Sequence, residues 1–564
     1  MKKIVVFIIC FCACIQFSNA QLGVNKEKFT HADTLRGTLN PNRTWWDVLR
    51  YDIEVKPDYN SKTIQGAVTI NFKINNSQKL MQIDLQKPLR IDSVYLLNLS
   101  GQKSKMHFRQ DENNNVAYID FNEILQKNSN AQLLIYYHGT PREATRPPWD
   151  GGWIWKKDVQ GRPWMSVACQ GLGASVWYPC KDHQSDEPDN GASLTVIVPD
   201  TLVAVGNGRL KNKTQNNDGT TTYTWEVKDP INNYNIIPYI GKYVTWSDTF
   251  QGEKGKLDLS YWVLDYNFDK AKKEFEQVKS MLKCFEHWFG PYPFYEDGYK
   301  LVESPHLGME HQSAVAYGNG YQNGYRGMDL SGSGWGLKWD FIIVHESAHE
   351  WFGNNITSKD LADMWVHEGF ANYSETLYTE CLFGKEAGND YNYGTRKRIE
   401  NDRNIIGPYG VNKEGSGDMY YKGGNMLQTI RHAINDDEKF RNILRGLNKV
   451  FYHQTVTTQQ IENYISKQSG IDFTKVFDQY LRSRQIPQFE YYISDDNKTL
   501  HYRWDSCVAD FNLRLVINKD NKTLTLQPTQ QWKILKLDNT NKMLFDTDYL
   551  DKNYYIRIQQ VKTK

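Results

Sequence analysis

The chain has 564 residues, of which 40% are hydrophobic and 24% are charged, and its formal net charge is +1. This length predicts three or four domains, and the composition is typical of globular proteins with several hydrophobic cores. A nearly neutral chain offers no long-range attraction for a polyanion, so we expect no nucleic-acid partner.

The N-terminus has the pattern of a targeting segment. Two lysines precede an apolar run over residues 4–17, and residues 18–20 are small, as cleavage before Gln21 requires. The apolar run is too short to span a membrane. We therefore expect residues 1–20 to be a signal peptide and the protein to be exported, either periplasmic or secreted. Cys14 raises the alternative of a lipid anchor, which the residues before it fit poorly.

Residues 21–245 are predicted to form a β-rich domain. Hydrophobic and polar residues alternate over 51–55 and 68–74, with a turn-prone stretch between them, and residues 194–198 and 223–227 are also strand-like. An alternation of two predicts strands with one buried face, so this part of the chain is expected to be mostly sheet.

Five cysteines follow the targeting segment: Cys169, Cys180, Cys284, Cys381 and Cys507. Five is an odd number, so at least one thiol is free. The sequence supports two interpretations of Cys169 and Cys180 equally, a disulfide formed in an oxidising compartment or two buried thiols.

Residues 246–486 turn helical, with a long helix opening at 271–278 and a glycine-rich stretch from 318 to 336 that we expect to be a loop near the site. After Pro487 the chain becomes strand-like again, at 489–493, 513–517 and 524–526. The length of this last part, residues 487–564, suits a small β-sandwich.

The strongest chemical signal is His345-Glu346-Ser347-Ala348-His349. On a helix, positions i and i+4 share a face, so both histidines can present ring nitrogens to one metal ion. Glu346 then lies near the metal without ligating it, where a general base belongs. Apolar residues flank the segment, and polar side chains buried among them would be costly without a metal to satisfy them.

Glu368 follows His349 after eighteen residues. This spacing lets the first helix end near Gly353 and a second, antiparallel helix begin at Leu361, so that Glu368 faces back on the histidines. Two His and one Glu leave the fourth tetrahedral position of a zinc ion to water, as a catalytic site requires. Glu375 lies seven residues further on; it either orients a ligating histidine or is a solvated helix residue.

These motifs resemble the gluzincin zinc aminopeptidases, peptidase family M1, which include aminopeptidase N and leukotriene hydrolase. The resemblance rests on the two histidines and the distant glutamate, the latter within Glu368-Gly369-Phe370-Ala371, and on three further segments. These are Gly308-Met309-Glu310, similar to the family's Gly-x-Met-Glu-Asn; Tyr420-Tyr421-Lys422-Gly423, similar to its Tyr-x-Lys-Gly; and Cys169-Gln170 followed by Trp177–Asp182, similar to a segment of its N-terminal domain. The segments keep the family's order and the flanking domains look similar too.

The resemblance implies a multidomain α+β fold. It would comprise a saddle-shaped N-terminal β domain (21–245), a thermolysin-like α/β catalytic domain (246–486) and a small C-terminal β-sandwich (487–564). We expect no large helical C-terminal domain of the kind that many members carry.

The resemblance also implies a function, removal of N-terminal residues from peptides with a free amino group, with one Zn²⁺ ion as cofactor. Glu346 would be the base, Tyr420 the donor to the oxyanion, and Glu310 and Gln170 the ligands of the substrate amine. The backbone at Gly308 and Met309 would run as an edge strand along the peptide.

The sequence departs from the family pattern at two positions. His311 and His367 stand where the family usually has Asn, which makes His311 a candidate titrating group beside the substrate.

The zinc motif would also fit two other functions, a thermolysin-like zinc endopeptidase and a non-catalytic zinc-containing peptide-binding protein. The motifs around Glu310 and Tyr420 favour the aminopeptidase.

Overall fold

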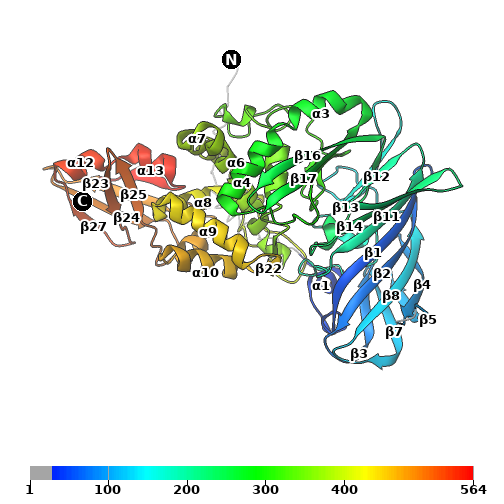
Figure 1. Ribbon diagram of the computed structural model, residues 1–564. Coiled ribbons are helices and arrows are strands. Elements are labelled where there is room, and N and C mark those ends of the chain that lie inside the picture. The colour runs from blue at the N-terminus through cyan, green and yellow to red at the C-terminus, as the bar shows by residue number, and fades with distance from the viewer. Residues whose placement is uncertain (1–27, 99–100, 563–564) are drawn as a thin grey trace, which may run out of the picture.

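The computed structural model describes residues 28–98 and 101–562, so the predicted signal peptide lies outside the described residues. Figure 1 shows an elongated molecule with a β-rich region at one end, a helical region in the middle and a small β region at the other end. The predicted multidomain α+β architecture is thereby confirmed.

An eight-stranded twisted sheet dominates the N-terminal region, with strand order β13-β14-β11-β1-β2-β8-β4-β5. Its strands are β1 (Trp46–Asp58), β2 (Thr63–Ile74), β4 (Arg90–Leu97), β5 (Lys103–Lys105), β8 (Asn130–Gly139), β11 (Ala192–Pro199), β13 (Arg209–Gln215) and β14 (Thr220–Val227). The two alternating segments that predict strands at 51–55 and 68–74 pair with each other in antiparallel register.

Two smaller sheets share a hydrophobic core with this large one and have the strand orders β3-β7-β6 and β12-β15-β10-β9. Their strands are β3 (Gln78–Asp84), β6 (His107–Asp111), β7 (Val116–Leu125), β9 (Gly152–Lys157), β10 (Pro163–Ala168), β12 (Val203–Val205) and β15 (Tyr239–Gly241). Two short helices, α1 (His31–Gly37) and α2 (Pro41–Thr44), precede them. The loop after β10 carries Gln170 and Gly171 towards the helical region.

A five-stranded sheet begins the middle region, with order β16-β17-β18-β20-β19. Its strands are β16 (Tyr243–Gly252), β17 (Gly255–Leu264), β18 (Tyr299–Glu303), β19 (Gly308–Met309) and β20 (Val315–Tyr317). Strand β19 is at the edge of the sheet, as expected for Gly308 and Met309.

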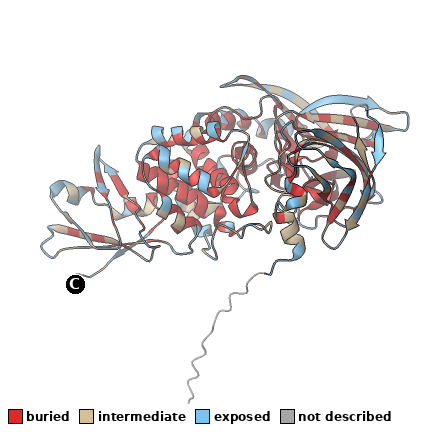
Figure 2. Cartoon of the chain, turned by 90° about the horizontal axis from the view of Figure 1, so that it is seen from below, coloured by how far each residue is buried: buried red, intermediate tan, exposed pale blue. Residues whose placement is uncertain are grey.

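Nine helices of the described chain follow or interrupt this sheet and make up most of the middle region. They are α3 (Phe268–Glu274), α4 (Gln277–Phe289), α5 (Phe341–Ala348), α6 (Trp365–Phe383), α7 (Lys385–Thr395), α8 (Tyr421–Ile434), α9 (Asp437–Val450), α10 (Thr458–Ser469) and α11 (Thr474–Leu481). A small parallel pair, β21 (Ile356–Ser358) and β22 (Gln454–Val456), lies between them. Figure 2 shows that the helices at the centre are buried on most of their surface.

The helix predicted to open at 271–278 is instead two helices, α3 and α4. The chain turns at Phe275, where the Val278 amide donates to the Phe275 carbonyl at 3.1 Å. This tighter turn directs the Phe275 ring into the core, where it meets Tyr317 edge to face.

A disulfide joins Cys284 of α4 to Cys381 of α6. Cys169 and Cys180 are buried free thiols, so the thiol interpretation of that pair holds and the disulfide interpretation does not. The two bonded cysteines are 97 residues apart, and their meeting depends on the packing of two helices rather than on any sequence pattern.

Two sheets and two helices form the C-terminal region. The strands are β23 (Gln488–Ile493), β24 (Thr499–Asp505), β25 (Leu515–Lys519), β26 (Lys522–Leu526), β27 (Lys533–Lys536) and β28 (Arg557–Gln560), and the helices are α12 (Asn539–Leu544) and α13 (Thr547–Asn553). One apolar cluster extends from the middle region into these strands, through residues such as Phe489 and Trp504.

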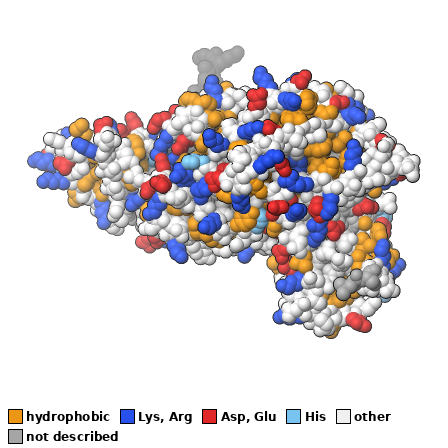
Figure 3. Space-filling model, viewed as in Figure 1, with side chains coloured by type: hydrophobic (Ala, Val, Ile, Leu, Met, Phe, Trp, Pro, Cys, Tyr) orange, Lys and Arg blue, Asp and Glu red, His pale blue; other side chains and the backbone are white. Residues whose placement is uncertain are grey.

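Basic and acidic side chains are interspersed on the face of the molecule that Figure 3 displays, and neither sign dominates it. Among the described helices, none combines the length and the hydrophobicity needed to cross a bilayer.

Candidate metal centre and active site

Helices α5 and α6 bring His345, His349 and Glu368 together. The Nε2 atoms of the two histidines lie 3.5 Å and 3.4 Å from Glu368 Oε2. One ligand atom from each residue can be chosen so that all three lie within 4.8 Å of one another. All three side chains are buried, so the predicted convergence on one point is observed.

The zinc motif begins on a capped helix. The Asp340 carboxylate accepts hydrogen bonds from the backbone N–H groups of Ile342 and Ile343, which fixes the first turn of α5. The helix ends at Ala348, earlier than the predicted Gly353. His349 keeps a helical conformation, with φ −64° and ψ −18°, so the i, i+4 relation of the two histidines survives.

Hydrogen bonds on the opposite ring nitrogen orient each histidine. His345 Nδ1 lies 2.8 Å from Glu375 Oε1, and His349 Nδ1 lies 2.9 Å from the Phe352 carbonyl. Glu375 is fully buried, which settles its two possible roles in favour of orienting His345. Its other oxygen accepts a 2.6 Å hydrogen bond from Tyr391 of α7. Tyr391 belongs to no motif and was not predicted as a site residue.

The electrostatics of the cluster favour a cation. Burial opposes the charged form of His345, but the Glu368 and Glu375 carboxylates outweigh burial and raise its pKa well above the ordinary value. The same balance, with Glu368 as the main opposing charge, raises the pKa of His349 to about 9. Glu368 Oε2 is buried without a hydrogen-bond partner, an arrangement that a bound ion would satisfy. Two imidazole nitrogens and one carboxylate oxygen form a donor set that suits zinc.

Glu346 points towards the edge strand β19 rather than into the helix bundle. A Cβ on Gly308 would come within 2.5 Å of Glu346 Oε1, so only glycine permits this approach of strand and carboxylate. Burial raises the pKa of Glu346 to about 7. Carboxylate oxygens of Glu346 and Glu310 lie within 4.8 Å of each other and of a ring nitrogen of His349.

Glu310 follows β19 and meets the N-terminal region. Its Oε1 accepts hydrogen bonds from the side-chain amide of Gln170 and, at 2.9 Å, from the hydroxyl of Tyr234. The Glu310 carbonyl accepts from the Asn354 amide at 2.8 Å, which ties the strand to the turn after α5. Burial raises the pKa of Glu310. Tyr234 was not anticipated from the sequence, because it lies in an asparagine-rich segment without a recognisable motif.

These groups face a cavity of about 780 Å³ between the N-terminal and middle regions. The glycine-rich loop contributes Tyr325 and Leu330 to its wall, so the predicted proximity of that loop to the site is confirmed. Trp149 stands at the cavity with 64% of its surface exposed.

Tyr420 lines the cavity immediately before α8, with its ring stacked on His345 at a centroid distance of 5.9 Å. Burial, reinforced by Glu368, raises the pKa of Tyr420 well above its ordinary value, so its hydroxyl keeps its proton. Tyr421 lines the same cavity.

His311 does not lie beside the cavity as a titrating group. Its Nδ1 is 2.7 Å from the Tyr239 hydroxyl, it is fully buried, and burial lowers its pKa well below the ordinary value. The prediction for His311 was therefore wrong, because its ring packs against Tyr239 of β15 and does not line the cavity. His367 is also buried, with Nε2 accepting the Ser358 amide at 2.8 Å.

Two family models match the chain. The Peptidase M1 N-terminal domain matches residues 48–234, and the Peptidase family M1 domain matches residues 273–480, which include the metal cluster. The chain belongs to peptidase family M1. The resemblance read from the motifs is thereby confirmed.

Individual relatives in the family are distant. Leukotriene A-4 hydrolase of Xenopus laevis is 22% identical over 334 residues, covering 56% of this chain and 51% of its own. Aminopeptidase B of Rattus norvegicus is 23% identical over 368 residues, covering 61% and 53%. The chain thus spans about half the length of the curated relatives it matches.

Solved M1 zinc metallopeptidases share the fold. A mutant of the enzyme from Deinococcus radiodurans superposes with a TM-score of 0.65 at 21% identity, covering 78% of this chain and 96% of its own. A two-domain M1 zinc metallopeptidase mutant bound to L-tryptophan gives a TM-score of 0.64, covering 76% and 92%.

Proposed function

We propose that this chain is a zinc-dependent aminopeptidase that hydrolyses the first peptide bond of peptides with a free N-terminus. One observation carries the proposal: the buried cluster of His345, His349 and Glu368 lies beside Glu346, and a second buried carboxylate, Glu310, adjoins it. The metal-binding cluster with Glu346 suits hydrolysis, and Glu310 suits the recognition of a terminal ammonium group. Membership in peptidase family M1 supports both assignments.

His345, His349 and Glu368 would hold the zinc ion. When bound there, zinc supplies a Lewis acid that polarises a carbonyl and lowers the pKa of a water molecule towards about 7. Glu346 takes a proton from the attacking water and returns it to the leaving amine. Its approach to Gly308 places this carboxylate beside the strand along which the peptide would run.

Tyr420 serves as the second stabilising group for the oxyanion. Its hydroxyl remains protonated, because burial and the nearby carboxylates raise its pKa, and so it can donate a hydrogen bond. A donor fixed in a water-poor cavity stabilises developing negative charge far more than a donor in water does.

Glu310 and Gln170 bind the substrate amine. The Gln170 amide nitrogen donates to Glu310, which leaves the amide oxygen to accept from the ammonium group. An ammonium group held by a buried carboxylate fixes the first peptide bond next to the metal. Gln170, Gly171 and Leu172 of the N-terminal region line the cavity together with Glu310, and we expect them to limit any extension beyond the amine.

We further propose that the protein is exported after cleavage before Gln21. The charge and hydropathy pattern of residues 1–20 supports this, and the Cys284–Cys381 disulfide suits an oxidising compartment. N-terminal sequencing of the protein recovered from an extracytoplasmic fraction should begin at Gln21. Recovery of the intact N-terminus in the cytoplasm would contradict export.

A panel of aminoacyl-anilides, each with a free and an N-acetylated amine, tests the activity. We expect hydrolysis of the free forms only, loss of activity with a chelator and recovery with zinc. Equal cleavage of the acetylated forms would instead indicate an endopeptidase. Zinc binding without any turnover across the panel would indicate a peptide-binding protein.

A further inference from the structure

The short helix α1 contributes to the position of the loop that follows β10 and carries Gln170, residues 169–182, here named the amine-binding loop. A guanidinium NH₂ of Arg36 donates to the Gly171 carbonyl at 2.5 Å, one residue after Gln170. The side-chain amide of Asn412, from the middle region, donates to the same carbonyl at 2.9 Å. The Gly171 carbonyl is thus held by one donor from the N-terminal region and one from the middle region.

Helix α1 also packs very closely against residues 410–412 of the middle region. A Cβ on Gly37 would lie 2.5 Å from the backbone nitrogens of both Val411 and Asn412. These are main-chain atoms, which cannot rotate away as a side chain would. The segment continues into Asn412 and Glu414 in the cavity wall, so α1 bridges two parts of the chain that face the substrate.

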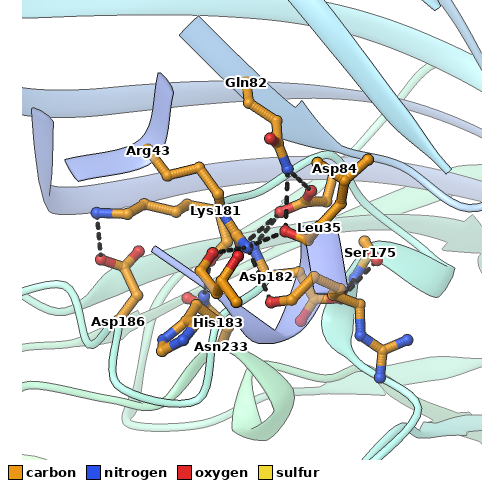
Figure 4. Close-up of polar contacts among 12 residues, drawn as sticks. Leu35, Arg43, Gln82, Asp84, Ser175, Lys181, Asp182, His183, Asp186 and Asn233 are labelled. Carbon is orange, nitrogen blue, oxygen red and sulfur yellow. Dashed lines mark hydrogen bonds and ion pairs between the residues drawn. The ribbon is translucent and has the colours of Figure 1, made fainter. Parts of the chain in front are cut away.

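A buried ion pair fixes the end of α1. Arg43 is fully buried and donates to the Asp84 carboxylate at 2.8 Å, as Figure 4 shows. Its other terminal nitrogen donates to three carbonyls at the end of the helix, those of Leu35, Arg36 and Thr38. Gln82 also approaches the Leu35 carbonyl and donates to Asp84 at 3.0 Å.

The Arg43–Asp84 ion pair also contacts the C-terminal end of the amine-binding loop. Asp84 accepts the backbone N–H of Asp182 at 2.8 Å, and the Asp182 carboxylate accepts the Ser175 hydroxyl at 2.5 Å (Figure 4). Residues 175 and 182 are therefore anchored to β3, while the tip at Gly171 is held by Arg36 and Asn412. A buried pair of this kind has a defined geometry, because leaving either charge unpaired is costly.

We propose that Arg36 and Asn412 are positioning residues that set the Gln170 amide against Glu310 for recognition of the substrate amine. The proposal rests on the proposed function of Gln170. Neither residue touches the metal cluster, and the Gly171 carbonyl is their common point of action. Loss of either donor lets the tip of the loop move, which weakens amine binding and leaves the hydrolytic groups in place.

A double-mutant cycle between Arg36→Ala and Gln170→Ala tests this, with the best free-amine anilide of the panel as substrate. We expect Arg36→Ala to raise KM about fivefold, the scale of one hydrogen bond, with kcat within twofold and zinc content unchanged. In the Gln170→Ala background the same change should raise KM less than twofold. Equal effects in both backgrounds would show a general structural role and overturn the proposal.

Two variants complete the design. Arg90→Ala removes an arginine of the same region that is 67% exposed and lies 3.4 Å from the Glu112 carboxylate, and it should leave KM unchanged. Asn412→Asp keeps the shape of the side chain but turns an acceptor towards the Gly171 carbonyl. It should raise KM as Arg36→Ala does, and an unaltered KM would remove Asn412 from the proposal.

Hydrogen–deuterium exchange separates this proposal from the proposed function. Exchange of residues 169–176 should be faster in Arg36→Ala than in the wild type and in Arg90→Ala. If the wild type hydrolyses no anilide, the proposed function fails, and the exchange result still decides whether Arg36 holds the loop. Unchanged exchange would overturn the positioning role whatever the activity.

Discussion

The two sides of the cavity are built in different ways. The zinc half, His345, Glu346, His349 and Glu368, comes from two successive helices within one short stretch of chain. The amine half, Gln170, Tyr234 and Glu310, joins residues as far as 140 positions apart across the boundary between two regions. Helical periodicity brings the two histidines together and the packing of two neighbouring helices adds Glu368, whereas the second set depends on how the N-terminal and middle regions pack.

This difference predicts a division of labour. The zinc half contains two histidines that are each oriented by a hydrogen bond on the ring nitrogen opposite the metal site, so its failure should show in turnover or metal content. The amine half acts through binding, so its failure should show in KM and in discrimination against blocked amines. A variant in one half that altered the quantity assigned to the other half would contradict this division.

The largest effect is expected from Glu346→Gln. The amide keeps the shape of the side chain but cannot accept the proton of the attacking water, so kcat should fall about 10²- to 10⁴-fold. Zinc content should stay at one ion per chain, since Glu346 is not a ligand. Stopped-assay kinetics with metal analysis provide the measurement, and a near-normal kcat would exclude Glu346 as the base.

Tyr420→Phe should reduce kcat about 10²- to 10³-fold through loss of one oxyanion donor. KM should change little, because the hydroxyl acts on charge that develops after binding. Tyr421→Phe is the matched control, since Tyr421 is adjacent and lines the same cavity. If Tyr421→Phe produced the larger loss, the roles of the two tyrosines would have to be exchanged.

Glu310→Gln tests the amine half directly. Removing a buried carboxylate that pairs with an ammonium group should lower kcat/KM on free-amine anilides roughly 10²-fold, mainly through KM. Zinc content should be unchanged. The discrimination between free and N-acetylated substrates should shrink with it. A drop in kcat at constant KM would instead assign Glu310 to the hydrolytic residues and contradict the separation of the two halves.

The sequence predicted the zinc half almost completely, for a physical reason. Two histidines at i, i+4 and a distant glutamate on a second helix need only two regular helices packed against each other to converge, and the early end of α5 at Ala348 did not disturb them. The edge strand at Gly308 was likewise predicted, and the alternating segments of the N-terminal sheet paired as expected.

What the sequence missed depends on tertiary packing. Tyr234, Tyr391 and Arg36 each act through one hydrogen bond to a residue on another structural element, 76, 16 and 135 positions away, and none belongs to a periodic pattern. The Cys284–Cys381 disulfide and the inward turn of His311 were missed for the same reason. The direction of these side chains depends on contacts with residues on other structural elements, which local sequence patterns do not predict.

The smallest effect among these predictions concerns Glu375→Gln, which sharpens the comparison within the zinc half. Glu375 accepts from His345 and from Tyr391, so its charge both orients the ring and strengthens it as a ligand. Loss of that charge should weaken zinc affinity about 10- to 100-fold, measured by competition with a chromophoric chelator. At saturating zinc, kcat and KM should return close to wild-type values, because the groups that touch the substrate are intact. A raised KM at saturating zinc would show that the two halves are coupled through α6 and that the division between them is too simple.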